Sequence, residues 1–102
     1  MALINDFNFS AFVITYKRPK VLVQTIQSIF KQTLVPEKLL IVDNDPEQSA
    51  LSVLPELEGL PIEYHPVGYN SGPAGGAYEG LKMLFVQGYQ WVLWRSEEHT
   101  SE

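Results

Sequence analysis

The stretch Lys38-Leu39-Leu40-Ile41-Val42-Asp43-Asn44 decides the fold that this sequence predicts. Its four consecutive apolar residues, two of them β-branched, are typical of a short strand buried on both faces of a parallel sheet. The apolar run stops at Asp43, so a carboxylate stands at the carboxyl end of that strand. Open α/β sheets bind ligands just outside these strand ends. Asp43 and Asn44 are therefore candidates for a ligand site, although Asn-Asp-Pro is equally good turn chemistry.

Three more strands are predicted from apolar runs at residues 9–16, 62–65 and 91–94. They alternate with segments of helical periodicity, so the predicted order is β-α-β-α-β-α-β. Strands separated in this way form right-handed crossover units. The sequence therefore predicts an α/β fold with one parallel sheet and helices on both of its faces.

The helix boundaries follow from proline, glycine and capping residues. The first helix should start at Pro19 and end before Val35, which precedes a proline. The second should be short, with Asp45 as its N-cap and Gln48 completing a capping box. The third should follow a glycine-rich turn at residues 67–76.

The composition is that of one small globular domain. The chain has 102 residues, of which 45% are hydrophobic and 19% charged. A net charge of −5 argues against nucleic-acid partners, and the absence of cysteine excludes a disulfide framework and a thiolate metal site. No apolar run approaches a membrane span of roughly 20 residues, and residues 1–9 lack the basic charge of a signal peptide. These features predict a cytoplasmic location, and leave peripheral association with the inner face of the membrane open.

Residues 95–102, Arg-Ser-Glu-Glu-His-Thr-Ser-Glu, differ in character from the rest of the chain. They contain no apolar residue, and they resemble a common sequencing-library adapter translated in one reading frame. We therefore expect residues 1–94 to be an incomplete natural domain and residues 95–102 to be a non-native, solvent-exposed tail. Glu97, Glu98 and His99 are accordingly not predicted to ligate a metal.

Two further segments follow predicted strands. In Thr15-Tyr16-Lys17-Arg18-Pro19 the tyrosine can stack on a base and the guanidinium can pair with a diphosphate, although such a segment alone favours a solvated loop. Asn70-Ser71-Gly72-Pro73-Ala74-Gly75-Gly76 leads into a helix whose amino end attracts anions. Its glycine spacing matches neither a P-loop nor G-x-G-x-x-G, and its small residues would equally serve close packing of helix and sheet.

In combination, these motifs resemble the nucleotide-sugar-binding part of family 2 glycosyltransferases of the GT-A fold. The resemblance covers residues 9–94 and implies a Rossmann-like three-layer sandwich with parallel sheet order 3-2-1-4. In it, Asp43 matches the acid that hydrogen-bonds the base. The nucleotide-binding residues that it implies are Thr15, Tyr16, Arg18, Asp43, Asn44, Asn70, Gly72, Gly75 and Gly76.

The resemblance also implies partners and a cofactor. The donor would be a nucleotide diphospho-sugar of the UDP or dTDP type, and the acceptor of the full-length protein a glycan or lipid-linked sugar. Mg²⁺ or Mn²⁺ would be held by clustered aspartates after the fourth strand, where Arg95 stands here. The catalytic base would lie further on. We therefore expect this chain to contain no catalytic residue, to bind no metal tightly and to transfer no sugar.

Two other classes compete with this interpretation. A response-regulator receiver domain needs an aspartate after a later strand, and none follows Asp45. A Rossmann-type nucleotide-binding or interaction module without transferase activity remains the alternative.

Overall fold

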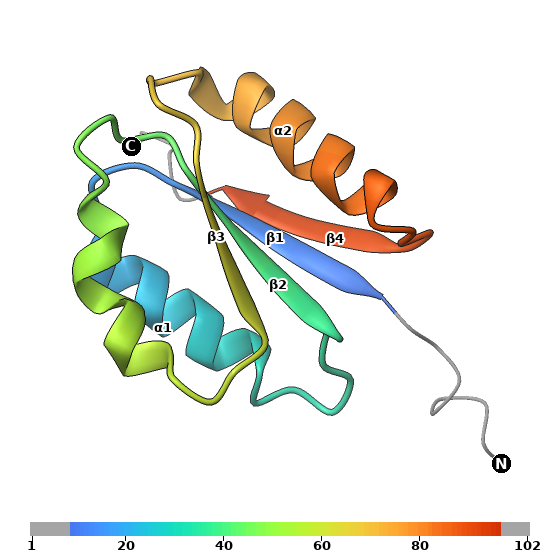
Figure 1. Ribbon diagram of the computed structural model, residues 1–102. Helices are drawn as coiled ribbons and strands as arrows, with labels where there is room; N and C mark the ends of the chain where they lie inside the picture. Colours follow the sequence, from blue (N-terminus) through green and yellow to red (C-terminus); the bar gives the residue numbers. More distant parts are fainter. Residues whose placement is uncertain (1–8, 97–102) are drawn as a thin grey trace, which may run out of the picture.

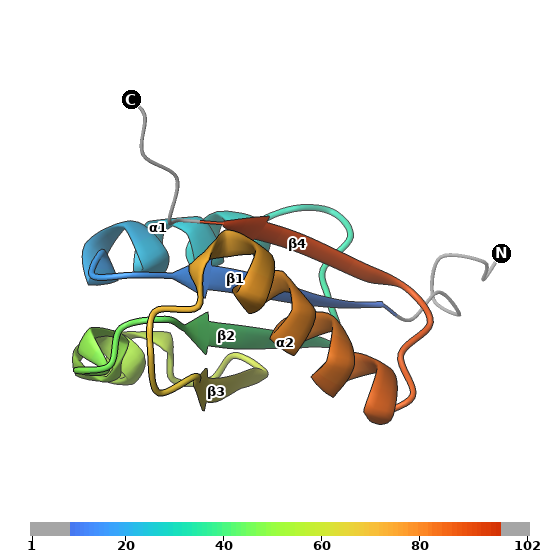
Figure 2. The ribbon, with the colours of Figure 1, turned by 90° about the horizontal axis from the view of Figure 1, so that it is seen from above.

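The computed structural model describes residues 9–96, which form a four-stranded sheet with helices on both faces (Figure 1). In chain order the elements are β1 (Ser10–Thr15), α1 (Pro19–Ile29), β2 (Lys38–Asp43), the 3₁₀ helix η2 (Ser49–Leu57), β3 (Ile62–Pro66), α2 (Gly72–Val86) and β4 (Val92–Ser96). The strands lie in the order β3-β2-β1-β4 and every neighbouring pair is parallel (Figure 2). The predicted α/β class and the sheet order 3-2-1-4 are confirmed.

The two central strands carry the core. All six residues of β1 and five of the six in β2 are buried, as expected for strands covered on both faces. Because successive side chains point to opposite faces, each strand contributes to two apolar clusters. The cluster toward α1 and η2 includes Ala11, Val13, Leu22, Ile26, Leu39, Ile41, Ala50 and Val53. The cluster toward α2 includes Phe12, Ile14, Leu40, Val42 and Leu84.

Helix α2 lies very close to the sheet because two of its contact residues are glycines. A Cβ atom at Gly76 would come within 2.7 Å of Ile14, and one at Gly80 within 2.5 Å of Phe12. The predicted turn at residues 67–76 was too long, since the helix already starts at Gly72. Gly72 has φ +76°, which glycine adopts without strain, and the following proline favours a first helical turn.

The predicted capping of the second helix was wrong. The helix is 3₁₀ rather than α, it starts at Ser49, and its N-cap is Gln48 in the left-handed region at φ 58°. Asp45 instead closes a turn, because its carboxylate accepts hydrogen bonds from the backbone N–H groups of Glu47 (2.9 Å) and Ser49 (3.3 Å). The first helix ends at Ile29, before Val35 as predicted, and a loop leads from there to β2.

Strand β4 lies at one edge of the sheet and extends two residues further than predicted. Arg95 is in register with Val13, so the start of the expected tail continues the strand. Glu97, Glu98 and His99 lie outside the described residues. The Trp94 ring stacks on Phe12 with centroids 5.6 Å apart, yet Trp94 is 49% exposed and Leu93 is 63% exposed.

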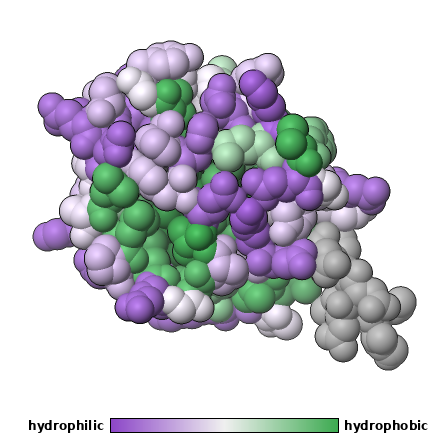
Figure 3. Space-filling model, viewed as in Figure 1, coloured by the Kyte–Doolittle hydropathy of each residue, from purple (hydrophilic) through white to green (hydrophobic). Residues whose placement is uncertain are grey.

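Other apolar side chains are exposed near the β3 edge of the sheet, which lies opposite to β4. Figure 3 shows hydrophobic residues gathered over η2 and the adjoining part of β3. Leu51 is exposed there, while Leu54, Leu60 and Ile62 are partly buried against the cluster below them. No helix within residues 9–96 is both long enough and apolar enough to cross a membrane.

Candidate functional site

The carboxyl ends of β1, β2 and β3 lie side by side at one end of the sheet. We call this end the carboxyl edge, to distinguish it from the lateral edges that β3 and β4 form. Thr15 is in register with Asp43, and Asp43 with Pro66. The segments that leave these strands are also tied together, since Asn44 N–H donates to the Thr15 carbonyl (2.9 Å) and Val67 N–H to the Asp43 carbonyl (3.0 Å). The edge therefore brings together the three segments in which nucleotide-binding residues were predicted.

Asp43 points into the protein rather than toward solvent. The residue is fully buried, and its Oδ1 accepts a hydrogen bond from the Asp45 N–H at 3.0 Å. Its Oδ2 accepts from the Tyr64 hydroxyl at 2.7 Å and from the Ala50 N–H at 3.3 Å. This carboxylate thus joins β2 to β3 and to the start of η2. Its predicted contact with a base stays a prediction.

Tyr64 is a residue of this edge that sequence reasoning missed. It lies on β3, 21 positions from Asp43 in the chain, and no local motif connects the two. Burial is the larger cause, and the hydrogen bond to Asp43 the second, of a pKa of the Tyr64 hydroxyl that lies well above its usual range. The phenol therefore stays protonated and donates to the carboxylate at any ordinary pH.

Asn44 is also fully buried and connects β2 to the segment before α2. Its Nδ2 donates to the Gly72 carbonyl at 3.0 Å. Its Oδ1 accepts from the Ser71 hydroxyl at 2.6 Å and lies 3.4 Å from the Ser71 backbone nitrogen, which also donates to it. Ser71, which was not predicted as a site residue, is thereby part of this edge.

A charged cluster lies beside these contacts. Lys17, whose φ is 56°, places its Nζ 3.3 Å from Asp45 and 3.2 Å from Glu47. The same ammonium lies 5.6 Å from the centroid of the Tyr16 ring. Asp45 is almost completely buried and Lys17 is exposed. The cluster connects the end of β1 to the turn after β2.

This cluster predicts a specific acid sensitivity. Hydrogen bonding by Ser49, then by the Glu47 N–H and Lys17, lowers the pKa of Asp45 from 3.8 to about 2. Because the pKa is lower in the folded than in the unfolded chain, this stabilisation is complete above about pH 4 and is lost as the pH falls toward 2. Urea unfolding at intervals between pH 2 and 6 should show the loss in the parent.

The control for this experiment is Asp45→Asn, which cannot titrate. The variant should be less stable than the parent at pH 6, and the difference should shrink as the pH falls to 2. A constant difference over the whole range would contradict the assignment to Asp45.

The remaining predicted residues divide between surface and core. Tyr16 is half-buried and Arg18 and Asn70 are exposed, so these three can reach a ligand. The Asn70 carboxamide oxygen accepts from the Gly72 N–H at 3.1 Å, which shapes the turn before α2. In contrast Thr15 is 1% exposed.

Gly75 and Gly76 lie inside α2, and the surroundings of Gly76 favour the close packing of helix and sheet that the sequence left open. Gly76 faces Ile14, as described above, and a Cβ atom at Gly75 would come within 2.6 Å of the Ser71 side chain. Direct contact of these two glycines with a nucleotide stays a prediction.

The end of β4 does not fit a divalent metal site. Mg²⁺ and Mn²⁺ prefer carboxylate oxygens, and β4 ends with the exposed Arg95 and with Ser96. Within residues 9–96 there is no group of three or more His, Cys, Asp or Glu that could hold a metal ion. The metal implied for the full-length protein stays a prediction about residues outside this stretch.

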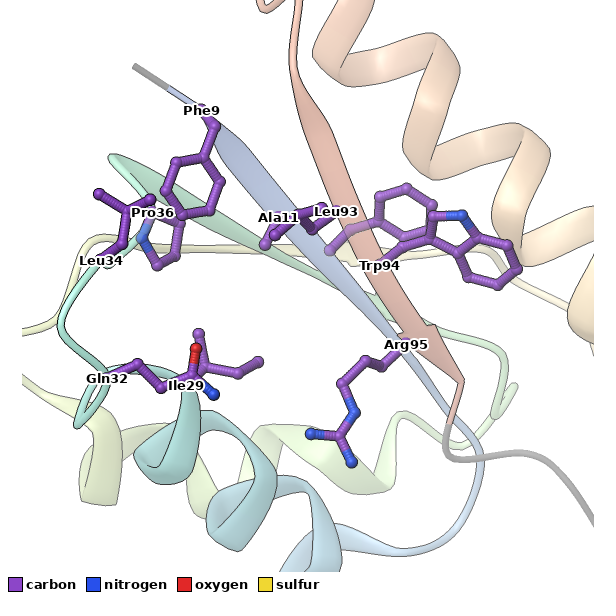
Figure 4. A pocket seen from close by; sticks show the side chains of 10 residues that line it. Phe9, Ala11, Ile29, Gln32, Leu34, Pro36, Leu93, Trp94 and Arg95 are labelled. Atoms are coloured by element: carbon purple, nitrogen blue, oxygen red, sulfur yellow. The ribbon is translucent and has the colours of Figure 1, made fainter. Parts of the chain in front are cut away.

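A groove of about 410 Å³ lies elsewhere, on the face of the sheet that carries α1 (Figure 4). Phe9, Leu34 and Pro36 line one end of it and Arg95 the other, with Leu93 between them. None of the predicted nucleotide-binding residues lines this groove. The groove is therefore separate from the edge at which the three strands end.

Comparisons with known proteins found matches that cover most of the chain. The family model described as glycosyl transferase family 2 matches residues 10–94. A curated protein named galactofuranosyltransferase GlfT1, from two strains of Mycobacterium tuberculosis, is 35% identical over 91 residues. The match covers 86% of this chain and 29% of each relative, so the chain spans about three tenths of their length. No solved structure gave a significant match.

Proposed function

The chain belongs to glycosyltransferase family 2, and we propose that it binds the nucleoside diphosphate part of a nucleotide-sugar donor at the carboxyl edge of its sheet. In the longer protein the sugar would pass to a hydroxyl of a glycan or lipid-linked acceptor. The donor would be of the UDP or dTDP type. The proposal includes a cytoplasmic location, close to the inner face of the membrane where the acceptor is lipid-linked.

The observation that carries this proposal is the convergence of three ligand-suited segments at one edge. The end of β1, the end of β2 and the turn before α2 are joined there by the contacts of Asn44 to Thr15 and Ser71. The carboxyl ends of parallel strands are where α/β folds bind nucleotides. No such convergence of predicted residues occurs at the groove beside β4.

The accessible side chains suggest how the donor would be held. The aromatic ring of Tyr16 suits stacking against a base, and the guanidinium fork of Arg18 suits two oxygens of a diphosphate. Lys17 is less suited to this role, because Asp45 and Glu47 already neutralise its charge. A metal would add neutralisation of the leaving diphosphate in the longer protein. The residues of this chain would bind and orient the donor, and would not carry out the transfer.

Arg18→Ala tests the proposal by titration calorimetry with UDP and dTDP. We expect weak binding by the parent and a loss of at least about tenfold in the variant, because a charge-assisted hydrogen bond contributes about 1.5–3 kcal/mol. Lys20→Ala is the matched control, since Lys20 is exposed and carries the same charge two residues further on. It should change the affinity by no more than about twofold, because it lies outside the strand-end segments.

Three outcomes would contradict the proposal. A folded parent that binds neither nucleotide would do so directly. An equal loss of affinity in both variants would indicate that the nucleotide is attracted non-specifically by the positive charges of Arg18 and Lys20. Equal affinity for UDP, GDP and adenine nucleotides would contradict a donor of the UDP or dTDP type and favour the alternative, a Rossmann-type nucleotide-binding module without transferase activity.

A further inference from the structure

We infer that Asn44 is a positioning residue of the nucleotide site, which anchors the segment before α2 to the ends of β1 and β2 and does not touch the donor. This inference rests on the proposed function, because it names the residue that assembles the proposed site. It differs from the prediction made from the sequence, in which Asn44 contacts the nucleotide directly.

The burial and the hydrogen bonds of Asn44 support this role. The residue is 0% exposed, so no part of it faces a ligand at the surface. Both ends of its carboxamide are engaged, Nδ2 with the Gly72 carbonyl (3.0 Å) and Oδ1 with the Ser71 hydroxyl (2.6 Å). Its backbone N–H is also engaged, with the Thr15 carbonyl at 2.9 Å. One residue thus joins the exits of β1 and β2 to the first turn of α2.

The segment that Asn44 holds has a backbone that needs such an anchor. Residues 68–70 are exposed, and Gly68 and Gly72 both have positive φ angles, +98° and +76°. Glycine loses more conformational freedom than any other residue when its backbone becomes ordered. The hydrogen bond from Val67 to Asp43 holds the start of the segment, and the contacts of Asn44 hold its end. The position of Asn70 and Gly72 relative to Tyr16 therefore depends on Asn44.

An amide is required because the partners are of opposite kinds. Gly72 presents a carbonyl, which needs a donor, and Ser71 presents a hydroxyl and an N–H, which need an acceptor. Aspartate at position 44 would still accept from Ser71, but it would set a carboxylate oxygen against the Gly72 carbonyl. Alanine would satisfy neither partner.

The test is a double-mutant cycle on UDP and dTDP affinity with Asn44→Ala, Ser71→Ala and the double variant. We expect Asn44→Ala to weaken binding about tenfold or more and Ser71→Ala to weaken it less. If Asn44 acts through this segment, adding Ser71→Ala to Asn44→Ala changes the affinity by no more than about twofold. Asn44→Asp, which keeps the acceptor for Ser71 but sets a buried carboxylate oxygen against the Gly72 carbonyl, should weaken binding at least as much as Asn44→Ala.

Two measurements separate positioning from a general loss of stability. Val53→Ala weakens the core cluster on the opposite face of the sheet, and it should lower the melting temperature without weakening nucleotide binding at a temperature where it is folded. Hydrogen exchange of the Ser71 amide, measured without nucleotide, should speed up in Asn44→Ala and not in Val53→Ala. Ser71→Ala supplies the affinity measurement if Asn44→Ala does not fold.

The outcomes separate the positioning role of Asn44 from the proposed nucleotide binding. Affinity losses that multiply in the double variant would mean that Asn44 acts independently of Ser71, and would overturn the inference. Unchanged exchange at Ser71 in Asn44→Ala, or a loss of affinity in Val53→Ala equal to that in Asn44→Ala, would also overturn it. A parent chain that binds no nucleotide overturns the proposed function instead, and the exchange measurement then decides the anchoring by itself.

Discussion

Replacing Asp43 with alanine is expected to lower the free energy of unfolding by about 3–5 kcal/mol, because it strands several buried donors at once. The carboxylate accepts from the Asp45 N–H, the Ala50 N–H and the Tyr64 hydroxyl. A buried donor left without an acceptor costs about 1–3 kcal/mol, and alanine offers none of the three an oxygen. Since small domains are stable by only about 5–15 kcal/mol, the variant should unfold at a much lower urea concentration.

Tyr64→Phe is the matched control, because it removes one donor and keeps the carboxylate. Its cost should be about 1.5–3 kcal/mol, the contribution of one hydrogen bond to a charged group, since both backbone N–H groups retain their acceptor. Urea melts of both variants, followed by fluorescence and circular dichroism, make the comparison. If the free energy of unfolding of Asp43→Ala lay within about 1 kcal/mol of that of the parent, this network would not be what holds the end of β2 to β3 and η2.

This result bears on how nucleotide binding is tested. Because Asp43 holds β2, β3 and η2 together, lost affinity in Asp43→Ala could come from lost structure alone. Tyr64→Phe leaves the carboxylate and its backbone contacts intact, so it is a better variant than Asp43→Ala for separating an effect of this network on binding from a loss of structure. Arg18, which is exposed, is better still for asking whether the edge binds a diphosphate.

Replacing Gly80 with leucine is expected to cost about 3 kcal/mol or more, and replacing it with alanine about 1–3 kcal/mol. A Cβ atom at Gly80 would lie 2.5, 2.6 and 2.7 Å from three ring atoms of Phe12, closer than real Cβ contacts allow. The Phe12 ring is fully buried and stacks on Trp94, so it has little room to move. The measurement is thermal or urea unfolding of the variants against the parent.

Helix propensity makes the opposite prediction and so provides the test. Alanine is favoured over glycine inside a helix by about 1 kcal/mol, so a chain without the contact would be stabilised by Gly80→Ala. A stabilised Gly80→Ala variant would thus falsify the close approach of α2 to the sheet. The double variant Phe12→Leu with Gly80→Ala should lose less stability than the sum of the two single changes, because the smaller side chain makes room for the new methyl group.

The arrangement of the fold was predictable because it depends on patterns that are local in the chain. The apolar run before Asp43 indicates a strand buried on both faces, and no tertiary information is needed to recognise it. Alternation of strands and helices then requires a parallel sheet, since parallel neighbours need a crossover between them. The start of α1 at Pro19 was also predicted, because proline suits the first turn of a helix.

Predictions failed where two local signals competed for the same residue. Asp45 was expected to cap a helix, but a short acidic side chain serves a turn as readily as a helix end, and here it closes a turn. The glycines at 75 and 76 suggested a loop, yet both lie in α2, where Gly76 allows the helix backbone to approach Ile14. Local propensity cannot decide such cases, since the deciding contact is with another element.

The sequence by itself predicted the parallel α/β architecture and the segments that gather at one edge of the sheet, because both depend on short-range periodicity and on motifs of a few residues. It resembled the family that the family model then matched. Only the tertiary structure decided which of those residues face solvent and which face inward. Asp43 pairs with Tyr64, 21 residues away, and Asn44 with Ser71, 27 residues away. The residue type at a strand end does not show whether its polar side chain binds a ligand or holds a neighbouring segment. Which of the two it does depends on the donors and acceptors that folding brings within hydrogen-bonding distance, and those come from distant parts of the chain.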